Sequence, residues 1–339
     1  LTFDTESTAL LGPITTNNTA SITGLTTVDA QGDITTFDTV SLTGGLSLLS
    51  GGAVTLSNQV SAAGLTVDAT NAATVSAQVT STSNVDITGG SVDIQAPITA
   101  EGQDVAITAT SGTTDIGGVI TTTGAAGVTG GDIDVQSFGS ISITSSLFAS
   151  AGSSAAAGLA AGNVTITATN AASTITFATG ADITTVGSQG GLPLAQGGSG
   201  GDVEIESAGG LITLNDTSIN TFGGEGGLGG GANQVGAGGD VDFLVGNVLL
   251  DSDTVTINTG SAAGSITFGT QAAPAASGPL VLIRRSGPGH VRGVQVDPRL
   301  SVDLDVVALD RHLAAGLQRD AGLSALQDEG LLGLEHQLG

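Results

Sequence analysis

Pairs of acidic residues two positions apart are the groups in this sequence whose type and spacing could do chemistry. Two carboxylates on either side of a glycosidic bond can hydrolyse it, and residues two apart on a strand share a face. The same pattern recurs along the chain, whereas a catalytic site needs to occur once. The recurrence therefore favours a solvated outer face of a repeated structure over catalysis. The pairs are Asp132 and Asp134, Asp202 and Glu204, Asp240 and Asp242, and Asp251 and Asp253.

Calcium is the metal ion that such carboxylates would prefer, because it binds oxygen ligands. The segment GGSGGD at 197–202 nearly fits the calcium-binding nonapeptide repeat GGxGxDxUx. Glu204, however, stands where that repeat places a large apolar residue, and no second copy follows. We expect no other cofactor, and the candidate ligands for a weakly held structural calcium ion are Asp202, Glu204, Asp240 and Asp242.

The charge distribution excludes several classes of partner. The chain of 339 residues has 31 acidic residues and 6 arginines, and all the arginines lie in 284–339. A surface without cations cannot neutralise phosphates, so residues 1–283 are not expected to bind nucleic acid or an anionic membrane surface. No run of about 18 apolar residues predicts insertion into a membrane. The absence of cysteine removes disulfides and thiolate metal sites.

A short phrase recurs through the chain and indicates the structure that positions the acids. Its form is Gly-Gly-x-[Val/Ile]-[Asp/Glu]-[Ile/Val/Phe], and short runs that alternate apolar and polar residues lie between the copies. Each run is long enough for one short strand. The copies lie at 89–94, 130–135, 200–205 and 238–243, with a looser one at 162–166.

Two all-β architectures could use these strands. Antiparallel hairpins would be joined by turns such as Asn-Gly, but the chain contains no Asn-Gly or Asp-Gly pair. A β-solenoid needs one phrase per coil and a small aliphatic interior, and the chain has no Tyr, Trp, Met or Cys. We therefore predict a parallel β-helix over residues 1–279, with Val203 and Ile205 inward and Glu204 outward.

The coils are expected to differ in length. Residues 20–100 repeat on a short spacing, whereas glycine-rich inserts at 187–201 and 223–239 lengthen the later coils. Such composition is typical of flexible linkers, so the inserts are predicted to be flexible flaps that leave one corner.

Threonine arrays offer another possible surface. Thr165, Thr167 and Thr169 share a strand face, and a flat array of hydroxyl groups could order water. Threonine is spread over the whole chain without a fixed spacing, so its high strand propensity is the favoured explanation.

The repeat GGDVEIESAGGLITLNDTSINTFGG at 200–224, with its glycine-rich insert and the next GGDVDF, resembles the filamentous haemagglutinin-type passengers of large bacterial exoproteins. The resemblance covers roughly residues 14–270. It implies a right-handed parallel β-helix, exported as in autotransporters and displayed or released as a stalk with adhesive roles. The family has no catalytic motif, so no functional residue is carried over.

The last part of the chain, 280–339, is compositionally distinct. The strand phrase ends, all three histidines (His290, His312 and His336) appear, and leucines in 303–319 have helical spacing. We expect short or weakly ordered helices here, either as a segment that caps the solenoid or because the reading frame is not the native one.

The sequence thus predicts a non-enzymatic, acidic β-solenoid that is secreted or lies on a bacterial outer surface. Its partner would be a carbohydrate or protein of a cell surface or extracellular matrix. The alternative is a carbohydrate-active β-helix enzyme, a polysaccharide lyase or hydrolase, with its site in a glycine-rich flap.

Overall fold

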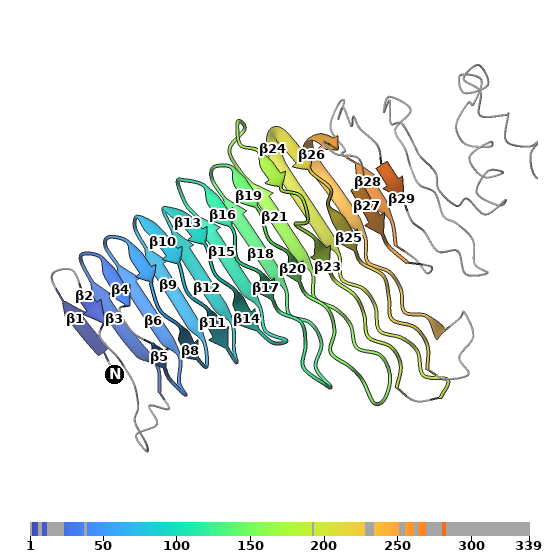
Figure 1. The fold of residues 1–339 in the computed structure, drawn as a ribbon, viewed down its shortest axis with the longest axis horizontal. Helices are drawn as coiled ribbons and strands as arrows, with labels where there is room; N and C mark the ends of the chain where they lie inside the picture. Colours follow the sequence, from blue (N-terminus) through green and yellow to red (C-terminus); the bar gives the residue numbers. More distant parts are fainter. Residues whose placement is uncertain are drawn as a thin grey trace, which may run out of the picture. The chain divides into compact units, whose positions relative to one another are not determined.

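Short strands wind into successive coils that stack along one axis (Figure 1). In the computed structural model, the described residues are 2–5, 9–11, 24–36, 39–191, 193–227, 234–250, 255–260, 264–268 and 280–282, all of them within the unit Leu1–Leu304. Every strand pairing among these residues is parallel, and the described residues contain no α-helix. The predicted all-β parallel β-helix is confirmed.

Each coil places strands on three faces, which we call the first, second and third face. The first face contains β1 (Thr2–Thr5), β3 (Thr26–Ala30), β6 (Leu46–Ser50), β9 (Leu65–Ala69), β12 (Val85–Gly89), β15 (Val105–Ala109), β18 (Ile133–Ser137), β21 (Val164–Ala168) and β28 (Ile266–Phe268). The second face contains β2 (Ala9–Leu11), β4 (Ile34–Thr36), β7 (Val54–Leu56), β10 (Ala72–Val75), β13 (Ser91–Ile94), β16 (Thr114–Ile116), β19 (Ile141–Ile143) and β22 (Ile175–Phe177).

Two long strands, β24 (Val203–Leu214) and β26 (Val241–Leu250), run through both of these faces. They join the two faces into one 19-stranded sheet within the described residues. The third face is a separate 10-stranded sheet made of β5 (Val40–Ser41), β8 (Val60–Ala62), β11 (Val79–Ser81), β14 (Ile98–Ala100), β17 (Ile120–Thr121), β20 (Leu147–Phe148), β23 (Ile183–Thr184), β25 (Ser218–Asn220), β27 (Val255–Asn258) and β29 (Leu280–Leu282).

The core is a set of aliphatic files that run from coil to coil. Alternate residues of each strand point inward, and the parallel register places like residues above one another, so each coil buries its apolar side chains against the next. Phe243 continues one file at its carboxy-terminal end and stacks on Phe268, with ring centroids 5.0 Å apart. That file reads Val28, Leu48, Val67, Ile87, Ile107, Val135, Ile166, Ile205 and Phe243.

The predicted inward and outward positions are confirmed. Val203 and Ile205 are 1% and 0% exposed, whereas Glu204 between them is on the outer side. The looser phrase at 162–166 also belongs to the repeat, because Val164 pairs with Val203.

The prediction that the phrase at 89–94 is equivalent to the other copies was wrong, because it lies on a different face of its coil. Its glycines lie at the end of β12 and at the corner that leads to the second face, and its Val-Asp-Ile is part of β13. The first-face strand of that coil is β12 itself, which pairs with β15. The sequence VDITG is therefore the true counterpart of VEIES at 203–207.

The coils lengthen along the chain, as expected. Hydrogen bonds between equivalent residues of neighbouring coils span 20 residues at Asp33 and at Asn84, but 39 at Asn163 and 38 at Asp202. The extra residues are placed at the corner between the third and first faces (Figure 1).

The predicted boundary at 279 falls among residues outside the described set. Residues 280–282 form β29, which pairs with β27 of the third face. The helices expected in 303–319, the three histidines and the six arginines lie outside the described residues.

Candidate functional site

In the three predicted acid pairs that the structure describes, the first carboxylate has a structural partner. Asp132 accepts a hydrogen bond from the backbone N–H of Asn163 at 2.7 Å, and Asp202 accepts one from the N–H of Asp240 at 2.8 Å. Asp240 accepts from both the N–H and the hydroxyl of Ser265, at 2.7 and 2.8 Å. These aspartates therefore bind the next coil at the corner between the third and first faces. The pair Asp251 and Asp253 lies outside the described residues.

These bonds form a continuous ladder, which we call the corner ladder, and two of its members are asparagines. Asn84 accepts from the N–H of Asp104 at 3.2 Å, and Asn163 accepts from the N–H of Asp202 at 2.8 Å. Since an amide oxygen serves as well as a carboxylate, the position requires a hydrogen-bond acceptor rather than a charge. The members of the corner ladder are Asn84, Asp104, Asp132, Asn163, Asp202, Asp240 and Ser265.

Glycine precedes the acceptor in most of these corners because the coils approach closely there. A Cβ on Gly201 would collide with the carbonyl oxygen of Gly162, and one on Gly239 with the carbonyl oxygen of Gly201. The Gly-Asp of the recurring phrase is thus a corner that allows close stacking and then hydrogen-bonds the next coil. This signal is visible in the sequence as an Asn or Asp directly before each first-face strand from β12 to β26, but its role was missed.

The second carboxylate of each described pair, Asp134, Glu204 or Asp242, faces outward on the first face. Glu204 and Asp242 are register partners on adjacent coils, whereas Asp134 lies between Ala106 and Thr165. Burial raises the pKa of Asp134, and the nearby charge of Asp132 raises this pKa further. Asp134 therefore ionises less readily than an isolated aspartate.

The four predicted calcium ligands lie on two adjacent coils. One carboxylate oxygen of Asp202 and one of Asp240 already accept backbone N–H groups in the corner ladder. In the described part of the chain, no group of three or more Asp, Glu, His or Cys residues could hold a metal ion. The geometry of Asp202, Glu204, Asp240 and Asp242 thus gives the calcium prediction no support.

The described parts of the glycine-rich inserts, 187–191, 193–201, 223–227 and 234–239, are packed, and for these parts the prediction of flexible flaps was wrong. Backbone hydrogen bonds of 2.7–3.0 Å link neighbouring inserts. In each bond the N–H of the first residue donates to the carbonyl oxygen of the second: Ser188 to Leu159, Gly198 to Ser188, Gly224 to Gly198, and Gly236 to Gly224. A Cβ on Gly224 would collide with the carbonyl of Ser188. Small residues are needed because the segments lie in backbone contact, so the glycine content reflects close packing rather than flexibility.

Buried threonines close the base of three inserts. Thr122, Thr185 and Thr221 are fully buried, and each donates its hydroxyl to the carbonyl of a glycine at the far end of its insert. The acceptors are Gly131, Gly201 and Gly239, at 2.6, 2.7 and 2.8 Å. The N–H of each glycine returns a bond to the threonine carbonyl.

Acidic side chains are unevenly distributed over the three faces. Among the first-face residues whose side chains the structure describes, seven acids face outward: Asp29, Asp68, Asp86, Asp134, Glu204, Glu206 and Asp242. Two more, Asp93 and Asp115, face outward on the second face. The register-paired outward positions of the third-face strands from β5 to β27 are all uncharged: Ser41, Ser61, Thr80, Thr99, Thr121, Phe148, Thr184, Ser218, Asn220, Thr256 and Asn258.

Hydroxyl ladders do occur, but not where the sequence indicated. Thr165 lies between Asp134 and Glu204, and Thr167 lies between Gln136 and Glu206. Files of three stacked threonines are Thr35, Thr55 and Thr74 of the second face and Thr80, Thr99 and Thr121 of the third face. They are not equally spaced in sequence because the coils differ in length.

Comparisons with known proteins give no relatives for this chain. No protein-family model matches it, and neither a curated protein nor a solved structure is significantly similar. Among the described residues, no helix is long and apolar enough to cross a membrane.

Proposed function

We propose that this chain is a non-enzymatic β-solenoid, secreted or displayed on a bacterial outer surface, that serves as a stalk or adhesive module. The observation that carries the proposal is the corner ladder. Carboxylates that resemble catalytic pairs in sequence bind backbone N–H groups of the next coil, and Asn163 does the same without a charge. Recurring structural use of the acids favours a scaffold over an active site.

The alternative, a polysaccharide lyase or hydrolase with its site in an insert, has little chemistry available. The inserts 123–130, 150–161, 186–200 and 222–238 contain one acidic residue, Glu225, and no Lys, Arg or His. Hydrolysis through paired carboxylates needs two such groups, and lyase chemistry on acidic sugars needs a basic group. A third possibility is a purely structural filament, which differs from the adhesive module only in having no ligand.

Incubation of the full chain with neutral and acidic polysaccharides and with intact cells would test the proposal. We expect retention on at least one surface and no release of oligosaccharide or new reducing ends. A matched control removes two outward acids, in the variant Glu204→Gln/Asp242→Asn, and should be retained equally. Saturable release of product that this variant abolishes would contradict the proposal and identify a hydrolase.

A further inference from the structure

The third face is an uncharged surface on a strongly acidic protein. Residues 1–283 carry 23 acids and no Lys, Arg or His, yet the outward positions of the third-face strands carry only hydroxyl, amide and phenyl groups. Acids flank this face on both sides. Asp182 directly precedes β23 and accepts the N–H of Ser218 at 2.8 Å, Asp216 precedes β25, and Glu101 directly follows β14, outside the stretch from β17 to β27. A polyanion would be repelled by the other faces, so the third face suits a neutral partner.

The inserts widen this face in the longer coils. On the third face, the N–H of Ala149 donates to the carbonyl of Thr184, and the N–H of Thr185 donates to the carbonyl of Asn220. This parallel hydrogen bonding extends two residues beyond the strands. Ala151 then donates to Val186, and Gly187 donates to Phe222, at 2.9 and 3.2 Å. A second outward file therefore runs beside the first, and it contains Thr123, Ser150, Val186 and Phe222.

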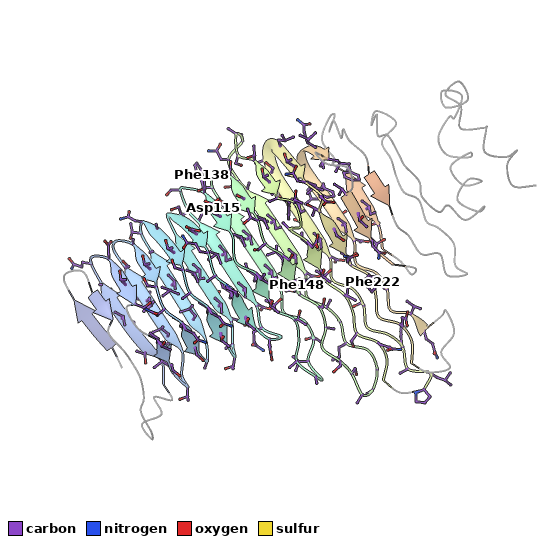
Figure 2. The ribbon with its side chains drawn as sticks, in the orientation of Figure 1. Asp115, Phe138, Phe148 and Phe222 are labelled. Carbon is purple, nitrogen blue, oxygen red and sulfur yellow. The ribbon has the colours of Figure 1, made fainter. Side chains whose placement is uncertain are left out.

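Two phenyl rings lie on the widened face. Phe148 occupies the first outward file and Phe222 the second, and both are partly exposed (Figure 2). One coil, that of Thr184, separates them, and neighbouring coils are about 4.8 Å apart, so the two rings are spaced about 10 Å along the axis. Hydroxyl and amide groups of Thr121, Thr184 and Asn220 lie in the same files.

We propose that the third face between β17 and β27 binds an extended, neutral, β-linked polysaccharide that lies along the solenoid axis. Sugar rings have apolar C–H faces that stack on phenyl rings, and their edges carry hydroxyl groups that exchange hydrogen bonds with threonine and asparagine. A straight chain fits a straight file of groups repeated once per coil. This inference rests on the proposed adhesive function and names the ligand class and the residues that would bind it.

Sedimentation of the full chain with microcrystalline cellulose and with chitin tests the inference. We expect saturable retention on at least one of them, and the variant Phe148→Ala/Phe222→Ala should weaken it about tenfold, which corresponds to about 1.4 kcal/mol. Phe138→Ala is the matched control. Phe138 is 46% exposed but lies after β18, at the corner between the first and second faces, so its removal should leave retention unchanged. Circular dichroism melting of each variant shows whether the fold persists.

Four outcomes would overturn the inference. Wild-type protein that stays in solution with both polymers is one, and equal losses for the double variant and Phe138→Ala are another. The third is concentration-dependent dimerisation in analytical ultracentrifugation that the double variant abolishes, because the face would then bind a second copy. Binding to cells that persists in the double variant would overturn the inference while leaving the proposed adhesive function intact.

Discussion

The short coils of residues 24–121 and the long coils of residues 122–260 share one core and differ at one corner. Both stack the same inward file, in which Ile107 and Ile205 occupy equivalent positions. The long coils add a layer of glycine-rich inserts linked by backbone hydrogen bonds. The comparison teaches that this solenoid can grow sideways without altering its core, because the added segments pack through backbone rather than side chains.

Replacing a core residue in either half should have the largest effect. Ile107→Asp and Ile205→Asp each bury an unpaired carboxylate at a position that is 0% exposed, and each should destabilise the protein by several kcal/mol. Chemical denaturation followed by circular dichroism measures the loss. Glu204→Gln, on the outer side of the same strand as Ile205, should be nearly neutral. An unchanged midpoint for Ile205→Asp, or a large loss in only one half, would show that the two halves do not share one core.

A methyl group on a glycine of an insert should show whether the insert is packed. Gly224→Ala places a Cβ against the backbone of Ser188 and should cost about 1–3 kcal/mol. Gly64→Ala, in a short coil, meets Asn84 O at 3.5 Å, an ordinary contact, and should be tolerated. Thermal melts of both variants test the difference. Equal tolerance would mean that the inserts are loose, as their composition alone suggested.

The corner ladder predicts a smaller effect that depends on the acceptor and not on the charge. Asp202→Ala leaves the N–H of Asp240 without its acceptor and should cost about 1 kcal/mol. Asp202→Asn should retain most of the stability, as Asn163 does naturally in the neighbouring coil. If the asparagine variant melts as low as the alanine variant, the negative charge itself is required, and the metal-ligand hypothesis for Asp202 regains support.

Asp134 predicts a small effect of pH. Its pKa is raised by burial and by the charge of Asp132, so its ionised form destabilises the folded state at neutral pH, and this penalty disappears as pH falls through the folded pKa. Asp134→Asn should therefore raise the melting temperature slightly at pH 7 and have less effect in mild acid. A variant that melts lower than wild type at pH 7 would contradict the assigned cause.

Much of the fold could be predicted from the alternation of small apolar and polar residues. The parallel solenoid, the inward positions of Val203 and Ile205 and the lengthening of the coils follow from local patterns. The corner ladder could not be predicted in this way, because each of its bonds joins residues 20 to 39 positions apart. Since the coils differ in length, no fixed sequence spacing marks these residues.

Two further errors have the same physical origin. The phrase at 89–94 looks like a first-face strand, but its glycines serve a different corner of the coil. Glycine at 187–201 and 223–239 suggested flexibility, since the neighbours that require a missing Cβ come from other coils. The uncharged third face was likewise hidden, because Thr121, Phe148, Thr184 and Asn220 become neighbours only when the coils stack.

Amide hydrogen exchange of the full chain, followed by mass spectrometry, tests most directly whether the inserts form a packed layer beside the solenoid. In a packed layer, peptides covering 186–191 and 222–227 should be protected from exchange to a similar degree as β23 and β25, because their N–H groups bond to neighbouring inserts. Exchange of these peptides at the rate of an unstructured chain, with the strands still protected, would contradict it. The widened third face would then be lost as a continuous surface.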